Sequence, residues 1–235
     1  MMTLVQIKGD VVDDETASFY AFFGIQAVSP KLVSDAIASD QDGELTLQIA
    51  SNGGDVFAAS EIYTMLKQYD GKVNVEVQGL AASAASVIAA AGDTVKMSPT
   101  AQIMIHRAWS VVQGNTEDAA HESEVLDKID HSIAAAYEAR TGMTEGELLD
   151  LMTKETWMGA QEAVDKGFAD EIMFVDDKQP QVAASAGVVV PKSAVNKLLN
   201  LISKAERKSR PEPSEHEQQS LRQRKLAILM SEKED

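Results

Sequence analysis

The stretch that decides the fold of this 235-residue chain reads Gly79-Leu80-Ala81-Ala82-Ser83-Ala84-Ala85-Ser86. Before it, residues 73–78 (Val-Asn-Val-Glu-Val-Gln) alternate apolar and polar side chains, which predicts a strand. From Ser83 to Ala91 every residue is Ala, Ser, Val or Ile, and a glycine follows, which predicts a short buried helix. Ser83 is therefore expected where a strand passes into a helix, the basic unit of α/β folds.

The sequence leaves two interpretations of Ser83 open. Serine is a favoured helix N-cap, so Ser83 can be a cap in front of a packed core helix. It can also be a nucleophile, because the free N–H groups and partial positive charge of a helix N-terminus stabilise an alkoxide or oxyanion. His106 favours the nucleophile: it ends the apolar run 103–105, 23 residues after Ser83, and imidazole is the usual base for serine. A buried core histidine is the alternative for His106.

The other three histidines do not indicate a site. His121 and His131 lie in a polar, charge-rich stretch, where a solvated helix face is the simplest interpretation. They are ten residues apart, whereas histidines that share a metal on one helix face are three or four apart. His216 lies in a tail rich in Glu, Gln and Pro. We expect neither a metal nor a cofactor.

A glycine pair precedes both of these motifs. Residues 45–50 alternate like a strand, Ser51-Asn52-Gly53-Gly54-Asp55 forms a turn, and residues 56–68 have a helical pattern. Such a turn can direct a backbone N–H into a cleft and let another backbone lie close to it. It can equally be no more than a tight connection between strand and helix.

Four blocks together carry a resemblance to a known family. They are Ser-Asn-Gly-Gly at 51–54, Gly-Leu-Ala-Ala-Ser-Ala-Ala-Ser at 79–86, Met-Ile-His at 104–106 and Glu-Ala-Val-Asp-Lys-Gly-Phe-Ala-Asp at 162–170. In order and spacing, over roughly residues 3–175, they resemble the proteolytic subunit of the Clp protease. The resemblance implies a serine endopeptidase in which Ser83 is the nucleophile and His106 the base. It also implies an oxyanion hole built from the N–H groups of Gly54 and Ala84.

The chain departs from the family pattern at two positions. Asn52 replaces the proline of the usual Ser-Pro-Gly-Gly turn, which should leave the glycine geometry intact. The third member of the family's triad is an aspartate, and counting back from residues 159–164 puts Glu155 at its position. A glutamate carboxylate can orient a histidine through its Nδ1–H, although the extra methylene changes its reach. Asp150 and Asp170 are the fallback candidates, and a surface carboxylate is the alternative for Glu155.

The N-terminal part suggests a subgroup within that family. Cellular Clp subunits carry an N-terminal hairpin that meets an ATPase ring, whereas this sequence starts almost at its first expected strand, residues 3–10. Residues 22–30 (Phe-Phe-Gly-Ile-Gln-Ala-Val-Ser-Pro) resemble the Clp-related head-maturation proteases of tailed phages and prophages. This resemblance implies processing of capsid and scaffold proteins in the bacterial host cytoplasm or inside the procapsid. A proteolytic partner of an ATPase unfoldase is the alternative.

Composition and charge exclude several classes. The formal net charge is −16, with 10 Lys/Arg against 30 Asp/Glu in residues 1–177, and 11 against 7 in residues 178–235. The acidic body argues against nucleic-acid binding, which needs basic clusters. The chain has no cysteine, hence neither a disulfide framework nor a thiolate metal site. No apolar stretch of some 18 residues predicts a membrane span, and no leader pattern precedes the first strand.

Two parts are expected along the chain: a Clp-like protease domain at 1–177 and a tail at 178–235. The tail reads as a linker at 179–191 followed by short amphipathic helices near 192–208 and 218–230. With its positive balance and apolar anchors, we expect it to serve assembly or to be removed by self-cleavage, and to carry no catalytic residue.

The body alternates expected strands (3–7, 45–50, 73–78, 94–97, 102–105, 171–175) and helices (30–39, 56–69, 83–91, 116–140, 145–153, 160–166). This predicts an α/β core with crossover connections. The resemblance makes it the Clp/crotonase-type spiral of β-β-α units, with the helix near 117–140 as a protruding handle that joins heptameric, perhaps stacked, rings. Two rival functions stay open: a crotonase-like acyl-CoA enzyme, which shares the fold without a serine nucleophile, and a non-catalytic scaffold.

Overall fold

The structure is a computed structural model that describes residues 3–175. The elements, in chain order, are β1 (Thr3–Val11), α1 (Asp14–Phe22), β2 (Ala27–Val28), α2 (Pro30–Ser39), β3 (Glu44–Gly54), α3 (Val56–Gln68), β4 (Lys72–Ala82), α4 (Ala84–Ala90), β5 (Thr94–Met97), β6 (Gln102–Ile105), α5 (Thr116–Thr141), α6 (Glu145–Thr153), β7 (Thr156–Gly159), α7 (Ala160–Asp165) and β8 (Glu171–Ile172). The predicted linker and helices of residues 178–235 lie outside the described residues.

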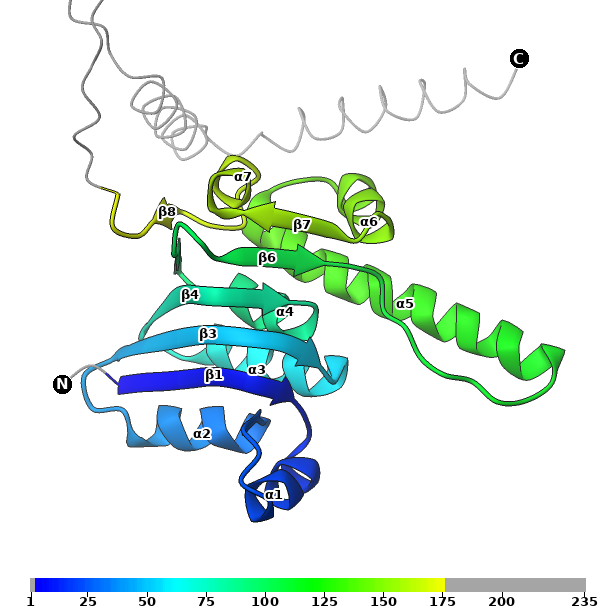
Figure 1. Ribbon diagram of the computed structural model, residues 1–235, viewed down its shortest axis with the longest axis horizontal. Helices are drawn as coiled ribbons and strands as arrows, with labels where there is room; N and C mark the ends of the chain where they lie inside the picture. The colour runs from blue at the N-terminus through cyan, green and yellow to red at the C-terminus, as the bar shows by residue number, and fades with distance from the viewer. Residues whose placement is uncertain (1–2, 176–235) are drawn as a thin grey trace, which may run out of the picture. The chain divides into compact units, whose positions relative to one another are not determined.

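The described strands form one sheet that is parallel except at β7 (Figure 1). Its main order is β2-β1-β3-β4-β5-β8. Strand β4 contacts two neighbours in succession: residues 74–77 pair with β5, and residues 80–82 pair with β6. The sheet therefore branches just before Ser83, and β6 and β7 form the branch. This mostly parallel α/β architecture confirms the predicted α/β class and is consistent with a Clp/crotonase-like fold.

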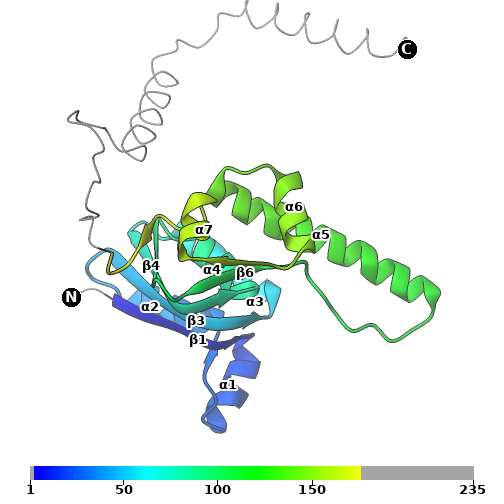
Figure 2. The same cartoon turned by 45° about the horizontal axis from the view of Figure 1, so that its top comes forward.

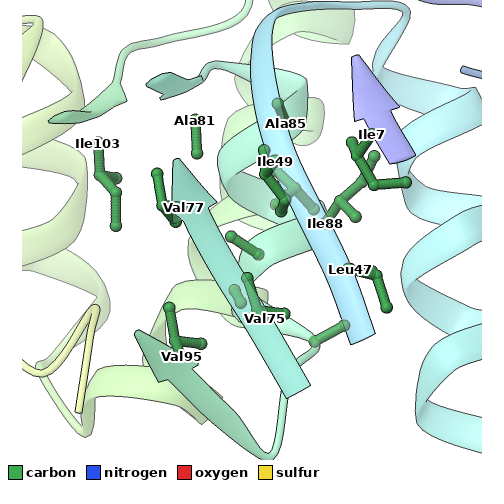
Figure 3. Close-up of a cluster of buried hydrophobic side chains, with 14 of the residues drawn as sticks. Ile7, Leu47, Ile49, Val75, Val77, Ala81, Ala85, Ile88, Val95 and Ile103 are labelled. Atoms are coloured by element: carbon green, nitrogen blue, oxygen red, sulfur yellow. The ribbon is translucent and has the colours of Figure 1, made fainter. Parts of the chain in front are cut away.

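Helix α4 is the centre of the core. All seven of its residues are buried, which explains why the sequence uses only small and apolar side chains there. Figure 3 shows Ala85 and Ile88 of this helix among Leu47, Ile49, Val75 and Val77 of the sheet, all with at most 1% exposure. Burying a side chain of this size stabilises the fold by roughly 1.5–3 kcal/mol. The same packing fixes the position of the turn at Ser83.

Three elements were absent from the sequence prediction. Helix α1 follows the N-cap residue Asp13 and has no buried residue, so its sequence shows no apolar periodicity that would predict a helix. Strand β2 has only two residues and pairs with the end of β1. Strand β7 has four residues and forms by antiparallel pairing with β6. The strand expected at 171–175 is shorter in the structure: β8 ends at Ile172.

Helix α5 is long, and only its second half belongs to the core. Its buried residues are Asp130, Ala134, Ala136 and Tyr137. The first half, together with the loop 106–115 that leads into it, extends away from the sheet (Figures 1 and 2). Its role in joining rings stays a prediction. No helix between residues 3 and 175 is long and apolar enough to cross a lipid bilayer.

Helices α5 and α6 are joined by a titratable pair, which gives a pH-dependent prediction. His131 Nδ1 lies 2.7 Å from Glu145 Oε1, and this hydrogen bond raises the pKa of His131. A raised histidine pKa means that the stabilisation is fully present below about pH 6.5, the value for an unfolded chain, and is lost as the pH rises through the folded value. We expect His131→Ala to lower the melting temperature at pH 6 and to have less effect at pH 8.5.

The matched control is His121→Ala, which removes an exposed histidine from the same helix. Thermal unfolding of the three proteins across pH 5.5–8.5 measures the difference. Equal destabilisation by His131→Ala at both ends of this range would show that the pair contributes packing and not charge.

Candidate active site

Ser83 lies at the point where β4 ends and α4 begins. Its backbone has φ 52° and ψ −123°, a conformation that costs a non-glycine residue roughly 1–3 kcal/mol. Its N–H donates to the Met104 carbonyl at 2.9 Å, and its carbonyl accepts from the Ser86 N–H at 2.9 Å. Although Ser83 occupies the N-cap position, its side chain makes no capping hydrogen bond. The N-cap interpretation is therefore wrong as an account of the hydroxyl, which has another partner.

That partner is His106. Strand β6 pairs in parallel with the end of β4, with Ala82 beside Met104, so the residues that follow both strands meet at one edge of the sheet. His106 Nε2 lies 2.7 Å from Ser83 Oγ. When Nδ1 carries the ring proton, the serine hydroxyl donates to Nε2, which is the arrangement that general-base activation of a serine requires. His106 is partly exposed, so the alternative that it is a buried core histidine is wrong.

The glycine pair packs directly on the turn at Ser83. A Cβ added to Gly53 would lie 2.9 Å from Ala84 N and 2.9 Å from Ser83 Cβ, so the two backbones are in close approach. Gly54 has φ 147°, and a Cβ there would lie 2.2 Å from the Val11 carbonyl oxygen. Both positions therefore require glycine. Gly54 is the glycine expected to supply an oxyanion donor, and Gly53 is the one that lets the turn lie close to Ser83.

These groups line one pocket with a volume of about 290 Å³. Gly54, Ser83, Ala84 and His106 contribute to its lining, so the two backbone positions predicted for an oxyanion hole belong to the same cavity as the serine. The apolar part of its wall comes from α3, α4, α5 and the loop after His106: Val56, Phe57, Val87, Ala108, Trp109, Val125, Leu126, Ile129, Ile133 and Tyr137. The cavity can therefore hold an apolar side chain beside a reacting carbonyl.

Glu155 lies close to His106 in the register of the sheet but does not bond to it. In the antiparallel pair β6–β7, Ile105 is opposite Thr156, so the next pair along the two chains is His106 and Glu155. The carboxylate instead accepts a hydrogen bond from Trp157 Nε1 at 3.1 Å. Among residues 3–175, no carboxylate is hydrogen-bonded to His106.

The two fallback carboxylates are less suitable. Asp170 accepts the N–H of Val95 at 2.7 Å and forms an ion pair with Arg140, so it holds β5 and α5. Asp150 lies on α6 and is exposed. Within the described part of the chain, no group of three or more His, Asp or Glu side chains is arranged to hold a metal ion.

The site has a serine hydroxyl bonded to an imidazole at the edge of a mostly parallel sheet, in a largely apolar pocket. This is the arrangement of an α/β serine hydrolase. Comparison with known proteins specifies which kind. The family model described as Clp protease matches residues 26–176. The chain belongs to the Clp protease family, and it is a serine-type peptidase.

Curated relatives agree with this family. The ATP-dependent Clp protease proteolytic subunit of Streptococcus agalactiae serotype V is 32% identical over 140 residues, which cover 58% of this chain and 71% of the relative. The subunit of the same name from Chlorella vulgaris is 31% identical over 60% of this chain and 71% of its own length. The one from Bacteroides fragilis ATCC 25285 is 29% identical over 74% and 81%.

Proposed function

We propose that the chain is an endopeptidase that forms an acyl-enzyme on Ser83. His106 Nε2 takes the hydroxyl proton as Oγ attacks a peptide carbonyl, and then delivers it to the leaving amine. Water hydrolyses the ester with the same histidine as base. The observation that carries this proposal is the 2.7 Å contact between Ser83 Oγ and His106 Nε2.

We assign the oxyanion to the N–H groups of Gly54 and Ala84, two residues that line the same pocket as the serine. Ala84 is the first residue of α4, so its N–H is one of the free donors of a helix N-terminus. Glu155 is proposed to steady the imidazolium of His106. The substrate would bind extended beside a strand edge, with an apolar side chain in the pocket lined by α4 and α5.

We further propose that the biological substrates are phage capsid and scaffold proteins. Residues 22–30, whose sequence resembles that of head-maturation proteases, run from the end of α1 through a loop and β2 to the first residue of α2. Phe22, Phe23 and Ile25 in this segment are 84%, 59% and 51% exposed, so the segment offers apolar contacts to another protein. The enzyme would act in the host cytoplasm or inside the procapsid.

A homo-oligomeric ring, heptameric as the resemblance implies, is part of the proposal. The matched relatives are named as subunits of an ATP-dependent protease, which favours a second candidate function: general protein degradation with an ATPase unfoldase. A crotonase-like acyl-CoA enzyme has no comparable support, because the family match is to the Clp protease. The Ser83–His106 contact argues equally against a non-catalytic scaffold.

Mass spectrometry of protein termini distinguishes these functions. We expect the enzyme, co-expressed with capsid and scaffold proteins of the same genome, to produce discrete new termini in them, because a shaped pocket selects the cleaved bond. The Ser83→Ala variant should produce none. The termini of the enzyme itself report any self-cleavage within 178–235.

General degradation would be favoured by a different outcome. Unrelated proteins would then be cut into small peptides at many sites, and only when a Clp ATPase and ATP are added. Identical termini with wild type and Ser83→Ala would contradict both functions.

A further inference from the structure

Buried polar side chains are concentrated around the active-site turns. In the described part of the chain five polar or charged residues are buried: Ser29, Thr46, Ser51, Ser86 and Asp130. Ser51 Oγ accepts the N–H of Gly53, next to the oxyanion position. Ser86 and Asp130 bond to the backbone at Ser83 and just after His106. Because a buried polar group costs free energy unless it is bonded, its placement at these turns calls for a reason.

The first contact runs from helix α5 to the nucleophile. Ser86 Oγ donates to the Ser83 carbonyl at 2.6 Å and lies 2.7 Å from the Tyr137 hydroxyl. A serine hydroxyl has one proton, so the phenol of Tyr137 must be the donor in the second bond. Burial raises the pKa of Tyr137 far above its ordinary value, so the phenol keeps this proton. The chain of bonds is Tyr137 O–H to Ser86 O–H to the Ser83 carbonyl.

This chain acts on a strained residue. The positive φ of Ser83 persists only where its surroundings over-determine it. The Ser83 carbonyl accepts the N–H groups of Ser86 at 2.9 Å and Val87 at 3.4 Å, and the shorter bond from Ser86 Oγ adds a side-chain donor that holds this carbonyl, and so the peptide plane that follows the residue. Rotation of that plane would move both Oγ, relative to His106, and the Ala84 N–H that is proposed to bind the oxyanion.

The second contact runs from the same helix to the residues after His106. Asp130 lies seven residues before Tyr137, which puts the two side chains two turns apart on one face of α5. Its Oδ1 accepts the Ala108 N–H at 2.7 Å, and its Oδ2 accepts from Arg107 Nη1 at 3.1 Å. Arg107 also donates from Nε to Thr153 Oγ1 on α6 at 2.8 Å. The main chain that leaves His106 is thereby tied to α5 and α6.

We infer that α5 is the positioning element of the active site: Tyr137, through Ser86, sets the backbone of Ser83, and Asp130 sets the backbone beyond His106. This inference rests on the proposed roles of Ser83 and His106. Tyr137, Ser86 and Asp130 are positioning residues. Tyr137 is among the residues that line the pocket, but its hydroxyl is bonded to Ser86.

Tyr137→Phe and Ser86→Ala test the first contact. Tyr137→Phe removes one buried oxygen and keeps the ring, so the fold should persist. We expect each to lower kcat for a short peptide about 5- to 20-fold with KM within twofold, the size of one lost hydrogen bond expressed in the transition state. The rate at which a fluorophosphonate phosphonylates Ser83, with fluoride as the leaving group, should fall by the same factor. Because both residues act along one chain, the double variant should be no slower than Ser86→Ala.

Asp130 is tested by a conservative pair. Asp130→Asn keeps an oxygen that can accept the Ala108 N–H, whereas Asp130→Ala removes both contacts. We expect Asp130→Asn to retain at least fivefold more kcat than Asp130→Ala, measured well below the melting temperature of both. Tyr63→Phe, which removes a phenol from α3 away from these contacts, is the control and should keep wild-type kcat.

The readouts separate the possible failures. Variants that melt at lower temperature but react with the fluorophosphonate and turn over peptide at wild-type rates would overturn the inference, because these contacts would then be structural only. Absence of fluorophosphonate labelling in the wild-type enzyme would instead overturn the proposed function, on which the inference rests. A double variant with a lower kcat than Ser86→Ala alone would show that Tyr137 does not act through Ser86, and would overturn this part of the inference.

Discussion

Replacing Ser83 by alanine is expected to abolish peptide hydrolysis, with a loss in kcat on the order of 10⁶-fold, the size measured for a serine nucleophile in a different protease. The physical reason is that no other hydroxyl lies within hydrogen-bond distance of His106 Nε2 in the described part of the chain. The fold should persist, because the Ser83 side chain makes no capping bond. Hydrolysis of a fluorogenic peptide, with intact mass to detect the acyl-enzyme, measures the effect.

His106→Ala should have a similar effect, and the double variant should be no worse than either single one, because the two residues act as a unit. Ser60→Ala and His121→Ala are matched controls, since both residues are exposed and lie on other helices. Retained turnover in Ser83→Ala, at the rate of the controls, would refute the mechanism.

The parts of the fold that the sequence predicted are those whose pattern reflects burial. Residues 45–50 and 73–78 alternate, and they form the cores of β3 and β4. The helix expected at 116–140 is α5, Thr116–Thr141, with a capping box at Asn115 and a left-handed C-cap at Gly142. Helix α1 and strand β7 were missed for the opposite reason. Helix α1 has no buried residue, and β7 has a single buried residue, Met158, and forms because β6 offers it a partner.

The candidate site was predictable to a similar extent. Ser83 and His106 could be paired from sequence because each follows a predicted strand, and neighbouring parallel strands end at the same edge of the sheet. Asp130 and Tyr137 could not, because one lies in a charge-rich stretch and the other looks like an ordinary core aromatic. Their shared face of α5, and its direction toward the two turns, are consequences of tertiary packing.

The sheet register is the main argument that Glu155 acts on His106. Directly opposite residues of an antiparallel pair have Cα atoms about 4.5–5.5 Å apart and side chains on the same face. His106 and Glu155 follow the last such pair, Ile105 and Thr156. Glu155 has φ 49°, so the chain turns there, and its carboxylate bonds to Trp157 Nε1. To orient His106, the Glu155 side chain has to rotate away from Trp157.

We therefore expect Glu155→Gln to lower kcat by about 10²- to 10⁴-fold, because an amide neither stabilises an imidazolium nor selects the tautomer with Nδ1 protonated. Glu155→Asp, which shortens the reach by one methylene, should retain more activity than Glu155→Gln. Trp157→Phe, which frees the carboxylate from its present partner, should keep kcat within a few-fold of wild type. Asp170→Asn is the control for a structural carboxylate: its bonds to Val95 and Arg140 predict a lower melting temperature with little change in kcat. A Glu155→Gln enzyme with near-wild-type kcat would remove Glu155 from the mechanism and leave His106 oriented by another group or by none.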